Sequence, residues 1–333
     1  MSVEVSTFAS KVCAVAVILL IGSPVAADAL HDHDNGPLTG FIGIPDSTEG
    51  SRLLDAGRSS WQSYVMTSSH SLTDTRLGET VLLDGETTRL ELIYRRGLTS
   101  NWEIGVELPY LWHESGGLDS LVDSWHGLFG LPEGNRRARP RDELAFLYSD
   151  PSGTRVNFRH NANGIGDVRL LAAYRLHSGD RYGMALRFGL KLPTGDSENL
   201  LGSGSADFSL GLAGDADTLF GVAGLSGFYR INAILVGEPE LLSDRYEELL
   251  GHAAIGLGYE LNNRVELRVQ GALRSTAYDS SVEVLGDPSG TITFGGHIRL
   301  SDRFRATIAV SEDVKVKSAP DVSFQLGLQY LPK

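Results

Sequence analysis

The sequence predicts an all-β protein, a transmembrane antiparallel up-and-down β-barrel of about twelve strands with one long outer loop that contains a short helix. Three observations support this prediction. Polar and apolar residues alternate over long stretches, short and long connections alternate between these stretches, and aromatic residues gather beside the short connections. The main alternative is a secreted soluble β-barrel or sandwich, whose apolar faces would form a core.

Alternation is clear in residues 164–176, where Val168 and Leu170 fall on one face and Asp167 and Arg169 on the other. Successive side chains of a strand point to opposite sides of the sheet, so the pattern gives one apolar and one polar face. Strands of soluble proteins usually have about five or six residues, whereas these run for about nine to twelve, as a tilted strand that crosses a bilayer requires. The predicted strands are 61–72, 88–96, 101–112, 164–176, 182–192, 206–213, 219–231, 253–261, 264–273, 291–300, 303–310 and 322–331.

The connections between these strands alternate in length. The short ones are built from Gly, Asn, Asp, Ser and Thr, as hairpin turns require. A membrane barrel with tight periplasmic turns and long outer loops has this asymmetry, whereas a soluble sandwich has no reason to sort its loops by end. The short turns are 97–101, 177–181, 214–218, 262–263 and 301–302, and the long connections are 73–86, 113–165, 193–205, 237–248, 274–289 and 311–320.

Aromatic residues supply an independent observation, because most of them lie within a few residues of a short turn. Amphipathic rings collect where a barrel wall meets the membrane interface. The apolar faces of the strands are therefore predicted to meet lipid. The predicted girdle at the short-turn end comprises Tyr94, Trp102, Tyr174, Tyr182, Phe220, Tyr259, Phe304 and Tyr330, and the opposite rim is marked by Tyr110, Trp112 and Tyr229.

The amino terminus has the pattern of a secretory signal peptide. Lys11 precedes about ten apolar residues, and the run ends in small residues that suit cleavage. We divide the chain into a signal peptide at 1–27, a partly disordered mature segment at 28–58 and an outer-membrane barrel at 59–331. Cys13 is the one cysteine of the sequence and lies in the signal peptide, so the mature chain is predicted to have no disulfide or cysteine metal site.

Charge narrows the choice of partners. The net charge of −13 remains after cleavage, since the predicted signal peptide holds one Glu and one Lys. A protein that binds DNA or RNA needs a basic surface, so no nucleic acid partner is expected. The interior of the chain has no apolar run of the roughly 18 residues that a spanning helix needs, which leaves strands to cross the membrane.

Inward positions of the predicted strands carry charges of both signs. A pore that selects one type of ion would favour rings of one sign, whereas mixed charges on neighbouring strands favour ion pairs that keep the lumen polar. Unpaired members would line a path for a small solute, and a barrel of about twelve strands leaves only a narrow one. The candidate lumen-lining residues are Arg89, Glu91, Glu103, Glu107, Asp167, Arg169, Arg175, Arg187, Lys191, Glu266, Arg268 and Arg299, with Arg95, Glu260 and Arg305 beside them.

The connection at 113–165 is too long for a simple turn. Apolar residues within it recur at helical spacing and predict a helix of about three turns, which must bury its apolar face. Against the barrel this helix would be a lid or plug, which we favour; lying outward it would be an interfacial helix. The basic stretch 136–141 is either a solvated loop face or a contact to lipopolysaccharide phosphates. The apolar face of the predicted helix is formed by Leu118, Leu121, Val122, Trp125, Leu128 and Phe129.

Signals for catalysis or metal binding are few. Ser68 and His70 share one strand face and could be the nucleophile and base of an outer-membrane lipase, but no third polar group is identifiable. The histidines and aspartates at 31–34 could hold a metal weakly, and we interpret them instead as part of a disordered tail. We therefore expect no enzyme activity, no cofactor and no metal site.

Several longer stretches resemble a family of Gram-negative proteins that is known only as domain of unknown function 3187. They include "LDGETTRLELIYRRGLTSNWEIGVELPYLWHESGG", "SWHGLFGLPEG", "GIGDVRLLAAYRL", "LKLPTGD", "LGSGSADFSLGL" and "AVSEDVKVKSAPDVSFQLGLQY". The resemblance covers nearly all of the mature chain. It implies an outer-membrane β-barrel, similar in pattern to outer-membrane channels of aromatic degradation pathways, and it carries no established activity.

Together these observations favour a narrow channel or passive transporter for a small solute in the bacterial outer membrane. Its expected partners are outer-membrane lipid, lipopolysaccharide, the barrel assembly machinery and the solute itself. Two other functions stay open: an outer-membrane enzyme that acts on lipid, and a structural or surface-contact barrel with a blocked lumen.

Overall fold

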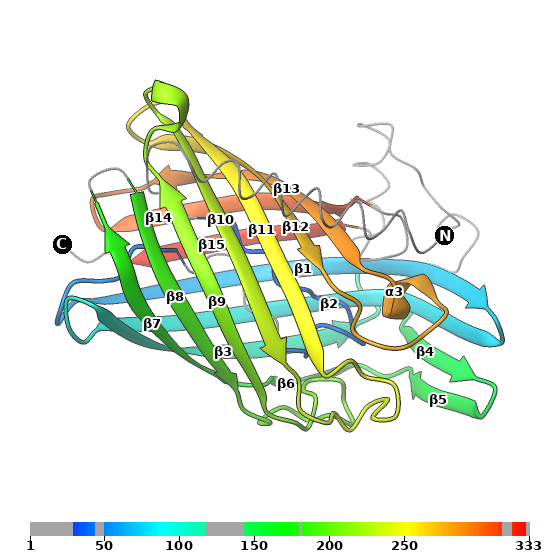
Figure 1. Ribbon diagram of the computed structural model, residues 1–333. Coiled ribbons are helices and arrows are strands. Elements are labelled where there is room, and N and C mark those ends of the chain that lie inside the picture. Colours follow the sequence, from blue (N-terminus) through cyan, green and yellow to red (C-terminus); the bar gives the residue numbers. More distant parts are fainter. Residues whose placement is uncertain (1–28, 44–49, 118–142, 180–181, 315–321, 331–333) are drawn as a thin grey trace.

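A computed structural model describes residues 29–43, 50–117, 143–179, 182–314 and 322–330. It confirms a closed barrel of twelve antiparallel strands, in which the last wall strand pairs with the first (Figure 1). No helix among the described residues could span a membrane, a finding that does not bear on strands. The wall strands are β1 (Ser59–Arg76), β2 (Glu79–Gly97), β3 (Trp102–Glu114), β7 (Arg169–Ser178), β8 (Tyr182–Lys191), β9 (Asp207–Ala216), β10 (Leu225–Leu235), β11 (Leu249–Glu260), β12 (Val265–Arg274), β13 (Ser289–Arg299), β14 (Phe304–Asp313) and β15 (Val322–Tyr330).

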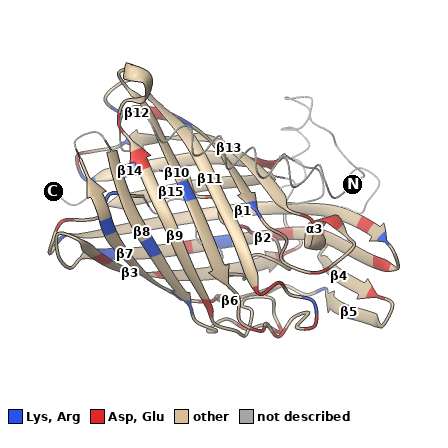
Figure 2. Cartoon of the chain, viewed as in Figure 1, with Lys and Arg blue, Asp and Glu red and all other residues tan. Residues whose placement is uncertain are grey.

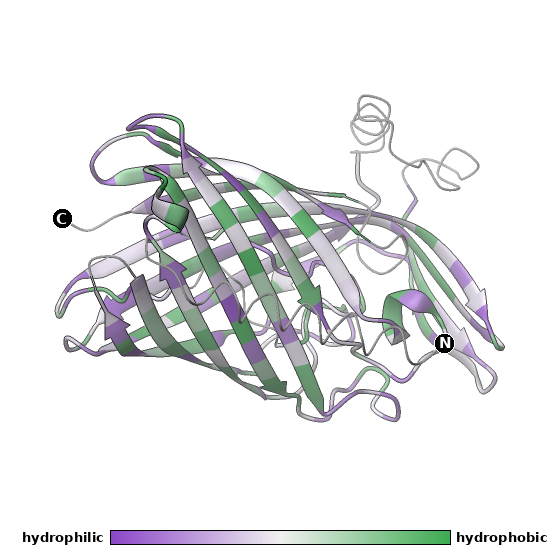
Figure 3. Cartoon of the chain, turned by 45° about the horizontal axis from the view of Figure 1, so that its top comes forward, coloured by the Kyte–Doolittle hydropathy of each residue, from purple (hydrophilic) through white to green (hydrophobic). Residues whose placement is uncertain are grey.

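The two faces of the wall differ as the alternation predicts, and Figure 3 shows hydrophobic and hydrophilic bands alternating along the strands. In β3 the carboxylates of Glu103 and Glu107 are buried inside the barrel, whereas Ile104 and Leu108, each next to one of them in the chain, are exposed on the outside. Apolar side chains on the outer face and polar ones inside are the reverse of a soluble β protein. This arrangement fits a wall that is surrounded by lipid.

Short turns join β2 to β3, β7 to β8, β11 to β12 and β13 to β14 at one end of the barrel, where β1 begins and β15 ends. Between β9 and β10 at this end lies the short helix η3 (Leu219–Gly221). The prediction of a long connection at 73–86 is wrong. There β1 and β2 continue as strands to a two-residue turn at Leu77 and Gly78, whose φ values of 47° and 87° are typical of a tight hairpin. This hairpin lacks the regular alternation of a wall strand, because it continues beyond the wall where no outward apolar pattern is needed.

Part of the connection at 113–165 forms further strands rather than a loop. β4 (Ala145–Asp150) pairs with the outer part of β2, β5 (Gly153–Phe158) pairs with β4, and β6 (Ala162–Ile165) pairs with the end of β3. β5, β4, β2 and β1 therefore form a sheet that extends beyond the long-loop rim, seen at the right of Figure 1. The predicted helix with Leu118, Leu121, Val122, Trp125, Leu128 and Phe129, and the basic stretch 136–141, lie outside the described residues.

We call residues 29–43 and 50–58, drawn in dark blue in Figure 1, the lumen segment. Most of it lies inside the barrel, and residues 55–58 are exposed at the short-turn end before β1. The prediction that residues 31–34 belong to a disordered tail is wrong, because His31, Asp32 and His33 are 1%, 4% and 7% exposed. Ala29 packs inside the barrel against Phe228. Burial against lipid requires an apolar pattern in the sequence, whereas a lumen offers polar partners and can bury polar residues. The burial of this segment therefore left no pattern that the sequence could show.

An apolar cluster, the outer cap, covers the lumen segment at the long-loop end. It joins the turn of the lumen segment to the extended sheet and to three outer loops, one of which carries the short helix α3 (Glu283–Gly286). The turn at the tip of β4 and β5 is fixed by Asp150: hydrogen bonds from Ser152 and Arg155 lower the pKa of this carboxyl to about 2, so it stays ionised at neutral pH. The cap includes Leu38, Phe41, Ile42, Leu72, Val81, Leu83, Phe146, Tyr148, Val156, Phe158, Leu200, Ile234, Leu242, Leu250, Tyr278, Val282 and Leu285.

Candidate functional site

The candidate site is the occupied lumen, and the structure places most of the predicted lining residues in it. Figure 2 shows basic and acidic residues distributed over neighbouring strands of the wall. Arg175 and Glu266 face inward and are half-buried, whereas Arg299 lies exposed at the end of β13 beside a short turn. The buried members are Arg89, Glu91, Glu103, Glu107, Asp167, Arg169, Arg187, Lys191 and Arg268.

These charges form ion pairs across neighbouring strands, as expected from their mixed signs. Arg89 on β2 contacts Glu91 on the same strand and lies 3.9 Å from Glu107 on β3, which is 3.2 Å from Arg169 on β7. A buried charge is tolerated only when it is paired and hydrogen-bonded. The wall is therefore a connected layer of compensated charges rather than a ring of one sign.

Two further groups of charges lie along β3 and β7 to β9. Glu103 is 3.4 Å from Arg95 and 3.0 Å from Arg187. The Lys191 ammonium lies 3.2 Å from Asp167 and 2.8 Å from Asp207.

Sequence reasoning missed three charged members of the wall, Asp207, Asp215 and Arg230. Asp215 pairs with Arg230 at 3.0 Å. Asp207 is the second residue of the predicted strand 206–213 and has its inward parity, so the alternation could have identified it. Asp215 fell in the predicted turn 214–218, so the alternation assigned it no inward position. The structure places it in the wall because β9 continues to Ala216.

The lumen segment satisfies hydrogen-bonding groups of this wall mainly through its backbone. Lys191 donates a hydrogen bond of 2.8 Å to the Phe41 carbonyl, and Asp207 accepts one of 2.8 Å from the Gly43 amide. Nearer the short-turn end, the amide of Gly57 donates to the Gly97 carbonyl at 2.8 Å. The segment therefore contacts the wall from the outer cap to the start of β1.

Side chains of the lumen segment also meet the wall. His31 lies 3.1 Å and His33 3.7 Å from the Glu91 carboxylate, and Asp32 lies 3.2 Å from His252 on β11. Among the described residues no group of three or more His, Cys, Asp or Glu side chains is arranged to hold a metal ion. The histidines and aspartates at 31–34 thus anchor the segment.

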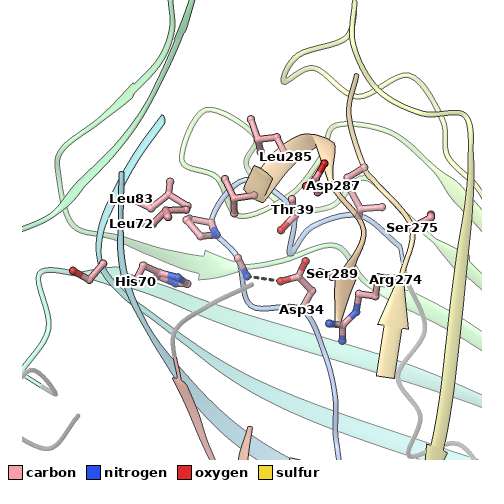
Figure 4. Close-up of a pocket in the computed structure, with 16 residues that line it drawn as sticks. Asp34, Thr39, His70, Leu72, Leu83, Arg274, Ser275, Leu285, Asp287 and Ser289 are labelled. Carbon is pink, nitrogen blue, oxygen red and sulfur yellow. Dashed lines mark hydrogen bonds between the residues drawn. The ribbon is translucent and has the colours of Figure 1, made fainter. Parts of the chain in front are cut away.

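Little free space remains around the turn of the lumen segment. Figure 4 shows a cavity there, with Leu72 and Leu83 on one side and Arg274 on the other. Its volume is about 30 Å³. A water molecule needs roughly 10 to 15 Å³ by this measure, so the cavity has room for one or two waters and is too small for an organic solute.

Ser68 and His70 do not form the predicted arrangement of a lipase. Both side chains are buried and point into the lumen from β1, away from the outer leaflet. The Ser68 hydroxyl lies 2.6 Å from that of Ser323, and His70 lies 3.1 Å from the Thr87 hydroxyl. A lipid in the membrane cannot reach either group, so the structural basis for an enzyme at these residues is lost.

The aromatic girdle is placed at one height by the register of the wall. Trp61 is the direct partner of both Tyr94 and Tyr330, and Tyr330 is also the partner of Phe304, so four rings follow one another across neighbouring strands. Trp61, which sequence reasoning left out of the girdle, is 56% exposed. The other members are Trp102 and Tyr174, which are direct partners, with Tyr182 and Tyr259 on β8 and β11. Phe220 lies in η3, and the rings of Tyr110 and Trp112 lie 4.5 Å apart in a tilted arrangement at the opposite rim.

Because the girdle lies on the outer face of the wall, we expect the rings of both Trp61 and Trp102 to contact lipid. In vesicles that contain brominated lipid, replacing both tryptophans by phenylalanine should remove most of the quenching of tryptophan emission, because both rings are exposed on the outer face. Steady-state fluorescence measures the effect, with Trp112→Phe as the comparison at the other rim. Quenching by a water-soluble quencher in place of the lipid would contradict a membrane-facing wall.

Comparison with known proteins agrees with this architecture. Residues 9–331 match the family described as "Protein of unknown function (DUF3187)", and no curated protein matches the sequence. The COG4313 outer membrane channel from Pseudomonas putida F1 is similar in structure, with a TM-score of 0.54, 13% identity and coverage of 84% of this chain and 96% of that chain.

Two porin structures were also found, at lower similarity. The NanC porin has a TM-score of 0.47 and 10% identity over 82% of this chain and 100% of that chain. The KdgM porin has a TM-score of 0.42 and 10% identity over 82% of this chain and 99% of that chain. The likeness to the COG4313 channel shows that the chain shares the fold of an outer-membrane β-barrel.

Proposed function

Since this chain belongs to the DUF3187 family, whose function is unknown, we propose from its own geometry that it is an outer-membrane channel for a small solute. In this proposal the lumen segment closes the channel at rest. Solute passes when the segment is displaced, and the charged inner wall then lines the path. Export by a cleaved signal peptide and contact with lipid and lipopolysaccharide belong to the same proposal.

The proposal rests on one observation: the lumen is filled by a separate segment of the chain and not by large side chains of the wall strands. A wall of about twelve strands encloses more space than inward side chains alone can fill. Around Ser51 and Leu53 the inward residues of the wall are small: Leu53 packs against Ala173 and Ala185, and Gly183 lies against Ser51. A purely structural barrel could fill this space with large side chains on its own strands. A separate segment, held by non-covalent contacts, can leave.

The segment can be locked or loosened by design, which gives a direct test. A Cβ at Gly183 would lie 3.5 Å from the Ser51 Cβ, within the range of about 3.5 to 4.5 Å of a disulfide. In the variant Ser51→Cys with Gly183→Cys, oxidation should hold the segment closed. A second variant, Ser51→Pro with Leu54→Pro, removes two amide donors of the segment without changing the wall, and should open the lumen.

Planar-bilayer conductance and liposome swelling measure both effects. We expect the proline variant to conduct, the oxidised cysteine variant to be silent, and reductant to restore its openings to the level of the wild type. The single cysteine variants control for the substitutions themselves, and heat-modifiable gel mobility shows that each variant is folded. A folded proline variant that neither conducts nor admits solutes would overturn the channel and favour a structural barrel.

A further inference from the structure

The lumen wall holds one peptide unit of the lumen segment from both sides. In the unit between Gly50 and Ser51, the carbonyl accepts a 2.9 Å hydrogen bond from Nε of Arg187. The amide of the same unit donates a 2.7 Å hydrogen bond to the Asp215 carboxylate. A cation on the oxygen and a carboxylate on the N–H thus clamp opposite edges of one amide plane.

A second unit, between Leu53 and Leu54, is held in the same way. The Leu53 carbonyl accepts from the Arg175 guanidinium at 3.1 Å, and the Leu54 amide donates to Glu103 at 2.7 Å. These contacts involve only backbone atoms of the segment. At Leu53 and Leu54 the wall therefore recognises the amide itself, whereas at Ser51 the side-chain hydroxyl also donates to Asp215.

A third contact uses a neutral group for the same purpose. The Gln270 side chain on β12 accepts from the Leu30 amide at 2.9 Å and donates to the Leu30 carbonyl at 3.0 Å. Its own amide thus pairs with the backbone as a neighbouring strand would. Three separate places in the lumen bind both the donor and the acceptor of a peptide backbone.

The clamps are built into the wall and do not depend on the segment for their shape. The second oxygen of Glu103 lies 3.0 Å from Arg187, and the second oxygen of Asp215 lies 3.0 Å from Arg230. Each carboxylate is therefore fixed by a buried wall cation while its other oxygen is free to accept. When the segment leaves, these oxygens and the Arg175 guanidinium need new partners, because a buried polar group without a partner is unfavourable.

We propose that the open lumen takes short peptides, and that the lumen segment is its internal peptide ligand. A trans amide presents its oxygen and its N–H in opposite directions, as the paired cation and carboxylate require. Sugars present hydroxyls without this fixed opposition, and apolar solutes would leave the charges unpaired. The inference rests on the proposed channel function and adds the chemical class of its solute.

The proline variant of the full chain, Ser51→Pro with Leu54→Pro, allows a direct comparison of solutes. Liposome swelling is measured with trialanine, with trialanine methylated on its amide nitrogens, and with a trisaccharide. We expect at least tenfold faster uptake of trialanine than of the methylated peptide, since methylation removes the donors for Glu103 and Asp215. Adding Arg175→Met should slow the uptake of both peptides, because Arg175 donates to a carbonyl oxygen, which methylation leaves in place, and neutralises no described carboxylate.

The outcomes separate the two proposals. Equal uptake of the three solutes would overturn the peptide inference and leave an unselective channel. No uptake of any solute by the folded variant would overturn the channel itself. The wild type gives a second measurement that needs no variant: added trialanine should speed hydrogen exchange at the Ser51 and Leu54 amides, with the Ala185 amide of β8 as the internal reference. Unchanged exchange at saturating peptide would count against a shared site.

Discussion

Replacing Lys191 by methionine should lower the free energy of unfolding by about 3 to 5 kcal/mol, the usual loss when one partner of a buried ion pair is removed. The Lys191 side chain is 3% exposed and lies between two carboxylates, Asp167 and Asp207. Methionine keeps the length of the side chain and removes the charge. Two buried carboxylates would then face each other without a cation, which is the main source of the loss.

The same substitution should also raise conductance. Lys191 donates to the Phe41 carbonyl at 2.8 Å, and Asp207 accepts from Gly43 at 2.8 Å, so one ammonium organises two contacts of the lumen segment. Urea titration of the folded barrel, followed by gel mobility, measures stability, and bilayer recordings measure opening. Arg96→Met is the matched control, because Arg96 is exposed on β2 and surface substitutions usually change stability by less than about 0.5 kcal/mol. Equal losses in the two variants would show that the Lys191 cluster has no special role.

The sequence predicted those parts of the molecule on which lipid imposes a pattern. A wall strand must present apolar side chains at every second position, so the twelve strands, the inward parity of Glu103 or Lys191 and the height of the girdle can be derived from alternation and turns. The outer part of the β1–β2 hairpin is surrounded by other loops and by solvent, so its sequence lacks the regular alternation of a wall strand and resembled a loop.

The lumen segment could not be predicted for a related reason. Its burial depends on partners that are distant in sequence, such as Gln270 for Leu30 and Asp215 for Ser51. Many of these contacts are to backbone atoms, which every residue carries, and the side chains that also bind the wall, such as His31 and Asp32, follow no periodic pattern that would mark the segment. Mixed charge on the wall correctly indicated ion pairing. Composition alone does not show that the same charged side chains also form hydrogen bonds with the backbone of the lumen segment.

Replacing Phe146 by alanine should destabilise the outer cap by about 3 to 5 kcal/mol, the usual cost of removing a buried aromatic ring. Phe146 is fully buried on β4. Its ring stacks on Phe158 at a centroid distance of 5.9 Å and meets the edges of His70 and His113 at 5.8 and 5.6 Å. The ring thus joins the extended sheet to the inner face of β1 and β3, and alanine would leave a cavity at that junction.

The Phe146→Ala variant distinguishes the cap from the lumen segment as barriers to passage. Hydrogen exchange in β4 and β5 should rise, while the gel mobility of the barrel and the conductance of the otherwise unchanged protein stay near those of the wild type, because the clamps on the lumen segment lie on other strands. Leu147→Ala, on the opposite face of the same strand, should have a smaller effect because Leu147 is only half-buried.

Full opening of the channel by Phe146→Ala alone would contradict this expectation. In that case the outer cap would be the main barrier, and the lumen segment would only support it. If Phe146→Ala raised conductance only in the Ser51→Pro and Leu54→Pro background, the two barriers would act in series, with the lumen segment as the first to open.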